Sequence, residues 1–326
     1  MTQRTAAPAM GAADWATLIG LSALWGGSFF FNGVAVRELP SFTIVWLRVA
    51  IGFAGLLVIL HASGERLPTE GRVLLALLGL GFVNNVIPFS LIVWGQHRIP
   101  SGLAAILNAT TPMFGAFAAH LLTRDEKLTP FKIVGIAIGF IGVSMLVGID
   151  ALGGIGSNVV GEAACIGAAV SYAFAAIYAR RFRHMGITPL AVATGQVGAA
   201  TLLMLPLMLA VDWPWTLPAP HPTTWAAMLG AGLLATSLAF ILYFRIIASA
   251  GATNALLVTF LVPISAILLG ALLLNEALVP RHTAGMALIG AGLAFIDGRL
   301  PRRLLHRRGR PAETTAALRS APAPGS

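Results

Sequence analysis

The feature that most constrains this chain is a series of apolar runs, each about 20 residues long. An α-helix of roughly 20 residues is about 30 Å long, which matches the hydrocarbon core of a bilayer. Of the 326 residues, 57% are hydrophobic and 10% are charged, whereas soluble domains average about 25% charged residues. A soluble core cannot absorb this much apolar sequence, so the runs predict an all-α integral membrane protein.

Loops that carry charges, prolines or glycines separate these runs, and they divide the sequence into ten predicted membrane helices. The predicted helices cover 15–36, 42–61, 73–94, 101–122, 131–149, 161–179, 188–211, 224–245, 252–273 and 282–299. A short segment, 1–14, precedes them, and a basic tail, 300–326, follows them.

Lysine and arginine are unevenly distributed among the loops. When the N-terminus is placed in the cytoplasm, only Arg37, Arg98 and Arg281 fall outside, and the other loop cations fall inside. Because cytoplasmic loops concentrate positive charge, we expect the N-terminal segment and the tail both to be cytoplasmic. Part of the net charge of +9 comes from an arginine cluster in this tail, Arg302, Arg303, Arg307, Arg308 and Arg310, which we expect to meet anionic lipid rather than nucleic acid.

The two halves of the chain resemble each other. A shift of 150 residues aligns Glu126 with Glu276, Pro130 with Pro280, Gly135 with Gly285, and Gly142 with Gly292. A shift of 151 aligns Phe89 with Phe240, and Pro112 with Pro263. The pattern predicts two repeats, 15–149 and 161–299, joined by a periplasmic linker, 150–160. Five helices is an odd number, so the second repeat enters the membrane inverted, and inverted repeats around a central cavity are typical of transporters.

Four segments carry a resemblance to a known family: ALWGGSFF, VWLRVAIGF, TRDEKLTPFKIVGIAIGFIGVSML and LNEALVPRHTAGMALIGAGLAFI. Over roughly residues 15–298 the chain resembles the EamA-type family of the drug/metabolite transporter superfamily. The resemblance implies ten helices, two inverted repeats and a central cavity. It also implies export of amino acids or related metabolites, and sometimes of toxic cations. We therefore expect a secondary transporter in the bacterial inner membrane that exports small organic metabolites.

Polar residues at membrane depth are the first candidates for a substrate site. Asn84 and Asn85 lie in the middle of the third predicted helix, where an amide without a partner is costly. The shift of 151 aligns Asn85 with Thr236, and it aligns Asn108 with Thr259. Nearby prolines free backbone carbonyls as further ligands. These residues are expected either to line a substrate cavity or to form hydrogen bonds between helices.

Aromatic residues are the second group of candidates. Trp25, Ser28 and Asn32 share one face of the first predicted helix, and Tyr172 and Tyr178 lie in the sixth. A cavity lined by Trp and Tyr can stack aromatic or cationic substrates. The alternative is an aromatic belt at the membrane interface.

One permanent charge, Arg48, lies roughly 9 Å inside the second predicted helix. Arginine stays protonated in proteins, so its side chain either extends to the interface or faces the cavity. Gln196 occupies the mirrored position in the seventh helix. A polar residue at both positions favours an inward-facing Arg48, which would hold a substrate carboxylate or the carbonyl end of a helix.

Other chemistry is weakly represented in the sequence. The chain lacks a phosphate-binding glycine loop and a HExxH motif, and Cys165 is its single cysteine, so we expect no cofactor and no metal. Glu162 is the candidate for proton coupling, or it caps a helix N-terminus. Gly135 and Gly139 form a GxxxG pattern that predicts close helix packing or a homodimer. The rival functions are a membrane enzyme or lipid-modifying subunit, and a receptor or scaffold that transports nothing.

Overall fold

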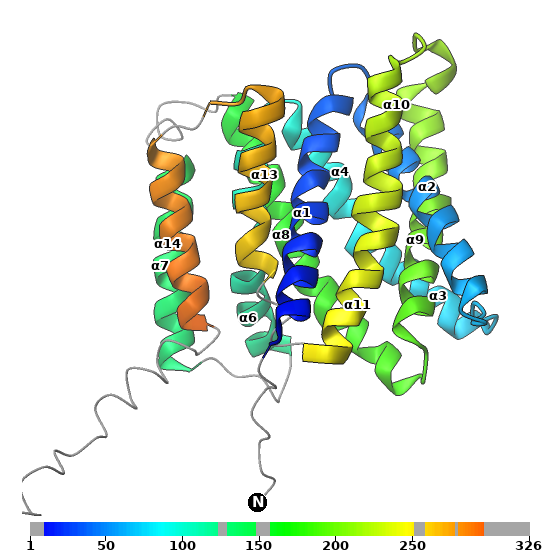
Figure 1. Ribbon diagram of the computed structural model, residues 1–326, viewed down its shortest axis with the longest axis horizontal. Helices are drawn as coiled ribbons and strands as arrows, with labels where there is room; N and C mark the ends of the chain where they lie inside the picture. The colour runs from blue at the N-terminus through cyan, green and yellow to red at the C-terminus, as the bar shows by residue number, and fades with distance from the viewer. Residues whose placement is uncertain (1–9, 123–128, 148–156, 251–257, 278–279, 297–326) are drawn as a thin grey trace, which may run out of the picture.

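The structure is a computed structural model, and it describes residues 10–122, 129–147, 157–250, 258–277 and 280–296. Within these ranges the regular structure is helical and no strand occurs, which confirms the all-α prediction (Figure 1). Three features discussed above lie outside the described residues: the basic tail, Glu126 and most of the predicted linker.

The helices of the first half are α1 (Ala12–Ala35), α2 (Ser41–Ala62), α3 (Gly71–Gly81), η1 (Phe82–Val86), α4 (Ile87–Gln96), α5 (Ser101–Asn108), α6 (Thr111–Leu122) and α7 (Pro130–Val147). Those of the second half are α8 (Ser157–His184), α9 (Pro189–Leu207), η3 (Met208–Asp212), η4 (Pro214–Thr216), α10 (Pro222–Leu229), η5 (Gly230–Leu238), α11 (Ala239–Ala250), α13 (Val258–Leu274) and α14 (Pro280–Ile296). Three segments, η1, η3 and η5, are π-helical, and η4 is a 3₁₀ turn.

Several helices join end to end into stretches that are long enough to cross a bilayer. Seven described stretches have the required length and apolar character: Ala12–Ala35, Ser41–Ala62, Gly71–Gln96, Ser101–Leu122, Asn158–Phe182, Pro189–Asp212 and Pro222–Ala250. Three further apolar stretches, in α7, α13 and α14, are shorter. The chain is therefore a multi-pass membrane protein. Where their residues are described, the predicted membrane segments fall on helical stretches, and ten crossings remain a prediction.

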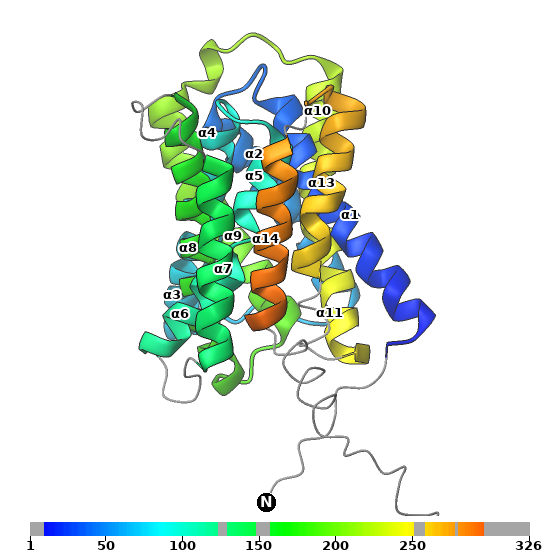
Figure 2. The same cartoon turned by 90° about the vertical axis from the view of Figure 1, so that its left-hand side faces the viewer.

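The helices pack in pairs that are far apart in the sequence. At one side of the bundle α7 lies along α14, and α1 lies along α13 nearer the centre (Figures 1 and 2). At the other side α2 packs on α9. Gly135 and Gly139 face α14, because a Cβ added at Gly292 would lie 2.5 Å from the Gly135 carbonyl oxygen and 2.9 Å from the Gly139 amide nitrogen. The GxxxG pattern thus serves close packing within the chain.

Two π-helical segments widen the helices beside the centre of the bundle. The segment η1 holds Asn84 and Asn85 and ends two residues before Pro88, which has no N–H to continue an α-helical ladder. The segment η5 holds Thr236 and Ser237, whose hydroxyls donate to the carbonyls five residues earlier, at 2.9 and 3.2 Å. Wider turns of this kind are frequent at functional sites because they re-aim side chains.

Candidate functional site

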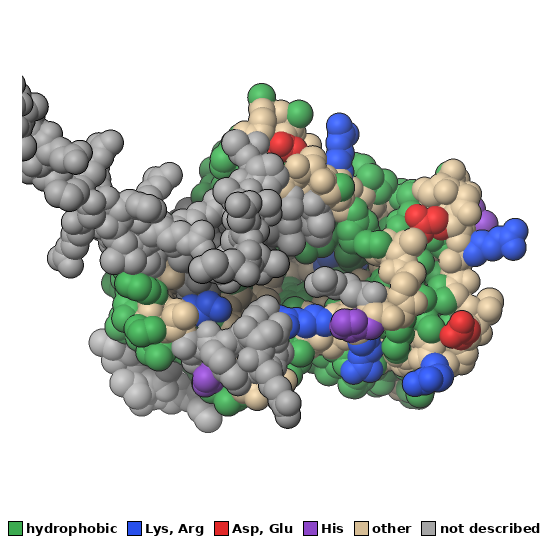
Figure 3. All heavy atoms as spheres, turned by 90° about the horizontal axis from the view of Figure 1, so that it is seen from below, with side chains coloured by type: hydrophobic (Ala, Val, Ile, Leu, Met, Phe, Trp, Pro, Cys, Tyr) green, Lys and Arg blue, Asp and Glu red, His purple; other side chains and the backbone are tan. Residues whose placement is uncertain are grey.

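A cavity of about 650 Å³ occupies the middle of the bundle. Its lining begins at mid-helix residues and reaches Phe182, Ile187 and Pro189, where α8 ends and α9 begins. This is the end of the bundle from which α1 starts (Figure 1). Figure 3 looks onto the same end, where the surface is hollowed and Lys and Arg side chains stand around the hollow. The cavity is therefore reached from one end.

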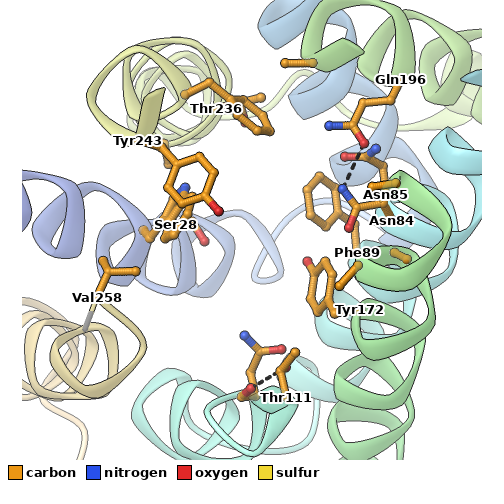
Figure 4. Close-up of a pocket in the computed structure, with 18 of the residues that line it drawn as sticks. Ser28, Asn84, Asn85, Phe89, Thr111, Tyr172, Gln196, Thr236, Tyr243 and Val258 are labelled. Atoms are coloured by element: carbon orange, nitrogen blue, oxygen red, sulfur yellow. Dashed lines mark hydrogen bonds between the residues drawn. The ribbon is translucent and has the colours of Figure 1, made fainter. Parts of the chain in front are cut away.

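One wall of the cavity is polar. It is formed by Arg48 from α2, Asn84 and Asn85 from η1, Tyr172 from α8, and Gln196 from α9. Four of these side chains gather on one side of the cavity in Figure 4, together with Phe89. A polar wall at membrane depth is stable only when its groups bond to one another, to water or to a ligand.

Arg48 faces this cavity and not the membrane interface. Its side chain is 6% exposed, and its guanidinium carbon lies 4.1 Å from the centre of the Phe89 ring. The contact is a cation–π interaction, which stabilises a buried cation only in part. Of the two orientations that the sequence left open for Arg48, the structure has the inward one.

The amides of the polar wall are only partly paired. Asn84 Nδ2 donates to Gln196 Oε1 at 2.9 Å, which joins η1 to α9 across the two halves of the chain. Arg48 Nε and Asn85 Nδ2 are buried and have no hydrogen-bond partner. A buried donor left unpaired costs about 1–3 kcal/mol, so an acceptor that pairs with either of these enclosed N–H groups would stabilise the site.

The opposite wall is aromatic. The Trp25 and Tyr243 rings are 5.4 Å apart and tilted, and Tyr243 contacts Phe244 at 5.8 Å. Phe240 stacks on Phe244 at 5.9 Å. Ser28 and Val258 also lie on this side (Figure 4). The sequence analysis missed the three aromatic residues of α11, although their i, i+3 and i+4 spacing places them on one helix face.

A third side of the cavity is formed where α5 ends and α6 begins. Asn108, Thr111 and Pro112 line it, and the Thr111 hydroxyl donates to the Asn108 carbonyl at 2.7 Å. Asn108 Oδ1 is buried and has no hydrogen-bond partner. This amide oxygen is an acceptor, in contrast to the two unpaired donors of the polar wall.

Most of the residues predicted to line a cavity do line it: Trp25, Ser28, Arg48, Asn84, Asn85, Asn108, Tyr172, Gln196, Thr236 and Thr259. Asn32 and Tyr178 are not among the residues that line it. Asn32 lies a full helical turn beyond Ser28 and donates to Gln96, and Tyr178 packs on Gly79 beneath Arg181. Glu162 is buried near the start of α8, outside the cavity lining.

A hydrogen-bond network joins the helices at the other end of the bundle, which we call the sealed end. Gln96 accepts from Asn32 at 3.1 Å, and its own amide donates to the Phe29 carbonyl and the Ser101 hydroxyl. The Glu276 carboxylate accepts from the backbone N–H groups of Ser101 and Gly102, at 2.8 and 3.1 Å. It thereby caps α5. These bonds connect α1, α4 and α5 with the segment after α13.

Glu38 makes a second contact between the halves at this end. Its carboxylate accepts from the Thr224 hydroxyl at 2.8 Å and from the His221 backbone N–H at 2.9 Å. Two hydrogen bonds hold the pKa of Glu38 below its ordinary value of 4.5: the one from Thr224 has the larger effect and the one from His221 the smaller.

In the described part of the chain, no group of three His, Cys, Asp or Glu side chains is placed to hold a metal ion.

Membrane-length helices around a cavity that is reached from one end define a polytopic membrane protein of the transporter type. A family model described as the EamA-like transporter family matches residues 15–148 and 159–297. The chain therefore belongs to the EamA-like transporter family, within the drug/metabolite transporter superfamily.

Similar proteins carry transporter names. The uncharacterized transporter YoaV of Bacillus subtilis is 25% identical, with 85% of this chain and 94% of YoaV covered. The uncharacterized inner membrane transporter YedA of Escherichia coli K12 is 27% identical, at 80% and 83% coverage. A probable terminal-alkyne amino-acid exporter of Streptantibioticus cattleyicolor is 28% identical, at 85% and 86%. One crystal structure, 22% identical, has the same fold, with a TM-score of 0.62 over 89% of this chain and 99% of the other.

Proposed function

We propose that this chain is a secondary transporter that exports small organic metabolites, amino acids or related compounds, across the bacterial inner membrane by alternating access. The observation that carries the proposal is the cavity at mid-bundle, which reaches one end of the bundle, while hydrogen bonds join the halves at the other end. A relative named as an amino-acid exporter supports the substrate class. Alternating access needs a central site that each side reaches in turn.

Two inverted five-helix repeats, 15–149 and 161–299, are the proposed architecture, and they would make ten crossings in all. Three pairs of residues support it, because each pair is 151 residues apart and both members line the cavity: Phe89 and Phe240, Asn85 and Thr236, and Asn108 and Thr259. The π-helical segments η1 and η5 are related by the same shift. A site built from equivalent positions of both repeats is what inverted repeats produce.

Both termini are proposed to lie in the cytoplasm. The open end of the cavity carries the ends of α8 and α11, with Arg180, Arg181 and Arg245, and positive charge favours the cytoplasmic side. In this orientation the cavity faces inward. A periplasmic reporter fused near Asn158 should then be active, and one fused after Arg308 should be inactive. An active fusion after Arg308 would refute the orientation.

Two partners remain proposals. The basic tail is proposed to bind anionic lipid on the cytoplasmic leaflet, because juxtamembrane arginine clusters are attracted to it. A homodimer would need a surface other than the GxxxG face, since Gly135 and Gly139 pack on α14.

Transport is tested with purified protein in proteoliposomes and with an export screen against toxic amino acids and their analogues. The proposal predicts saturable flux and resistance on expression, whereas an enzyme or a receptor moves no solute. Asn85→Leu removes a buried donor of the polar wall and should abolish flux at unchanged expression. Asn158→Leu is the matched control, because Asn158 is exposed at the start of α8 and should retain flux. Wild-type flux in Asn85→Leu would make Asn85 purely structural.

A further inference from the structure

The polar wall of the cavity allows the substrate class to be narrowed, and this step rests on the proposed function. We propose that the cavity recognises the carboxylate of its substrate through Arg48 and Asn85, and that the rest of the substrate is apolar or aromatic. An ammonium group on the same molecule is dispensable.

The first observation is the chemistry of the unpaired atoms. Arg48 is 6% exposed and Asn85 is 2% exposed, both residues line the cavity, and each has an enclosed N–H group without a partner. Two donors on one wall call for an acceptor. An ionised carboxylate accepts from both at once, and its bonds to a guanidinium are stronger and more directional than those of a neutral carbonyl.

The second observation is charge. Among the described residues that line the cavity, Arg48 is the one that carries a charge. A buried cation without a counter-ion is costly, and the face of the Phe89 ring compensates it only in part. A bound anion supplies the missing charge. A cationic substrate would add a second positive charge to the same site, which selects against it.

The third observation is the arrangement of the walls. Across the cavity from the polar wall, Trp25, Phe240, Tyr243 and Phe244 form an apolar surface for the body of the substrate. The cavity volume of about 650 Å³ suits a small organic molecule. An α-ammonium would find the Asn108 amide oxygen as an acceptor, which is neutral. The ammonium therefore gains a hydrogen bond and no ion pair.

Four compounds that share a phenyl group distinguish recognition of the carboxylate from recognition of the ammonium: phenylalanine, 3-phenylpropionate, phenylalaninamide and 3-phenylpropanamide. The first two carry the carboxylate, and the first and third carry the ammonium. Uptake into proteoliposomes and ligand-induced rise in Tm in detergent are measured for each compound. Both carboxylates should be transported and should raise Tm, with a preference over their amides of roughly 10- to 100-fold, as expected for charge-assisted hydrogen bonds.

Variants of Arg48 test the assignment to this residue. Arg48→Lys should lower the preference for carboxylates, because lysine loses the planar fork, and Arg48→Leu should abolish it in both assays. Where Arg48→Leu does not fold, Arg48→Lys still decides the question. Arg98→Gln is the matched control, since Arg98 also stacks on an aromatic ring, at 3.7 Å from the centre of Trp94, but is exposed outside the cavity. It should keep the wild-type preference.

Three outcomes would overturn the inference: transport that follows the ammonium, equal transport of all four compounds, or transport of none. Wild-type preference in Arg48→Lys and Arg48→Leu would overturn the role of Arg48. Failure of the inference differs from failure of the proposed function, because a protein that moves other metabolites in the export screen is still a transporter.

Discussion

The two ends of the helix bundle differ in how the halves of the chain meet. At the sealed end, one set of bonds runs through the buried side chains of Asn32, Gln96 and Ser101 of the first half to the half-buried Glu276 of the second. Glu38 adds a more exposed contact at this end. At the open end, the described hydrogen bonds between halves join exposed side chains, Asp14 with Ser249 and Glu65 with Thr188. The cavity reaches the surface between these outer contacts.

The difference teaches that a few hydrogen bonds distinguish a sealed end from an open one. A net hydrogen bond contributes about 0.5–1.5 kcal/mol, and one to a charged group about 1.5–3 kcal/mol. A ligand that binds the two states unequally can offset energies of this size. On the proposed function, bonds of this size would hold this end closed and still allow a ligand to open it.

Filling the open end is expected to have the largest effect. Ala176 lines the cavity in α8 and is exposed, so the indole of Ala176→Trp extends into empty space without overpacking the core. It should block access and reduce flux in proteoliposomes at least tenfold, while Tm changes little.

Ala163→Trp is the matched control, because Ala163 is exposed on the same helix and does not line the cavity. It should retain flux. Equal loss in both variants would mean that a bulky side chain on α8 harms the protein generally, and full flux in Ala176→Trp would show that the open end is not the route.

Weakening the seal should have an intermediate effect. Glu276→Gln keeps one acceptor oxygen but turns an NH₂ group toward the second backbone N–H. Losing one bond to a charged group should raise the amide hydrogen exchange of Ser101 and Gly102 roughly tenfold. Mass spectrometry of the peptide that contains the start of α5 measures this.

Glu70→Gln provides the comparison for that exchange experiment. Glu70 stands at the N-cap of α3 and makes no side-chain cap bond. Amide hydrogen exchange at both ends of the helix bundle should therefore remain unchanged in this variant. Wild-type exchange in Glu276→Gln would show that its carboxylate does not hold this end closed.

Acid should have the smallest effect, through the second contact between the halves. The pKa of Glu38 is lowered in the folded protein by Thr224 and His221. Its contribution to stability is therefore present above pH 4.5, the ordinary value, and is lost as pH falls through the folded pKa. The Tm difference between wild type and Glu38→Gln should be small at pH 6 and vanish toward pH 3. A difference independent of pH would contradict this role.

The helices and much of the cavity could be predicted because both depend on regular patterns. Hydrophobic length marks the helices, and polar residues in such helices have few tolerable places other than an interior cavity. The internal repeat also predicted that Asn85 and Thr236 lie at matching depths in the membrane, and both line the same cavity. These signals are local in the sequence or repeat in it, so no knowledge of the packing is needed.

The remainder depends on packing. Asn32 shares a helix face with Trp25 and Ser28, yet it lies past the point where Gln96 closes the bundle. Tyr178 follows Tyr172 by six residues, so it turns toward Gly79 of α3. The aromatic face of α11 reads as ordinary apolar sequence in a membrane helix. Only the arrangement of neighbouring helices separates a cavity wall from a packed or lipid-facing surface.

Alternating access is tested most directly by a single cysteine in the cavity. Ser28 lines it from α1, and Ser28→Cys in a Cys165→Ala background leaves one thiol near mid-membrane. Sealed vesicles of each orientation are treated with a membrane-impermeant thiol reagent. The thiol should react quickly from the cytoplasmic side and slowly from the outer side, and Glu276→Gln should accelerate the outer reaction. Reaction from one side alone, in both backgrounds, would contradict alternating access and leave a one-sided binding pocket.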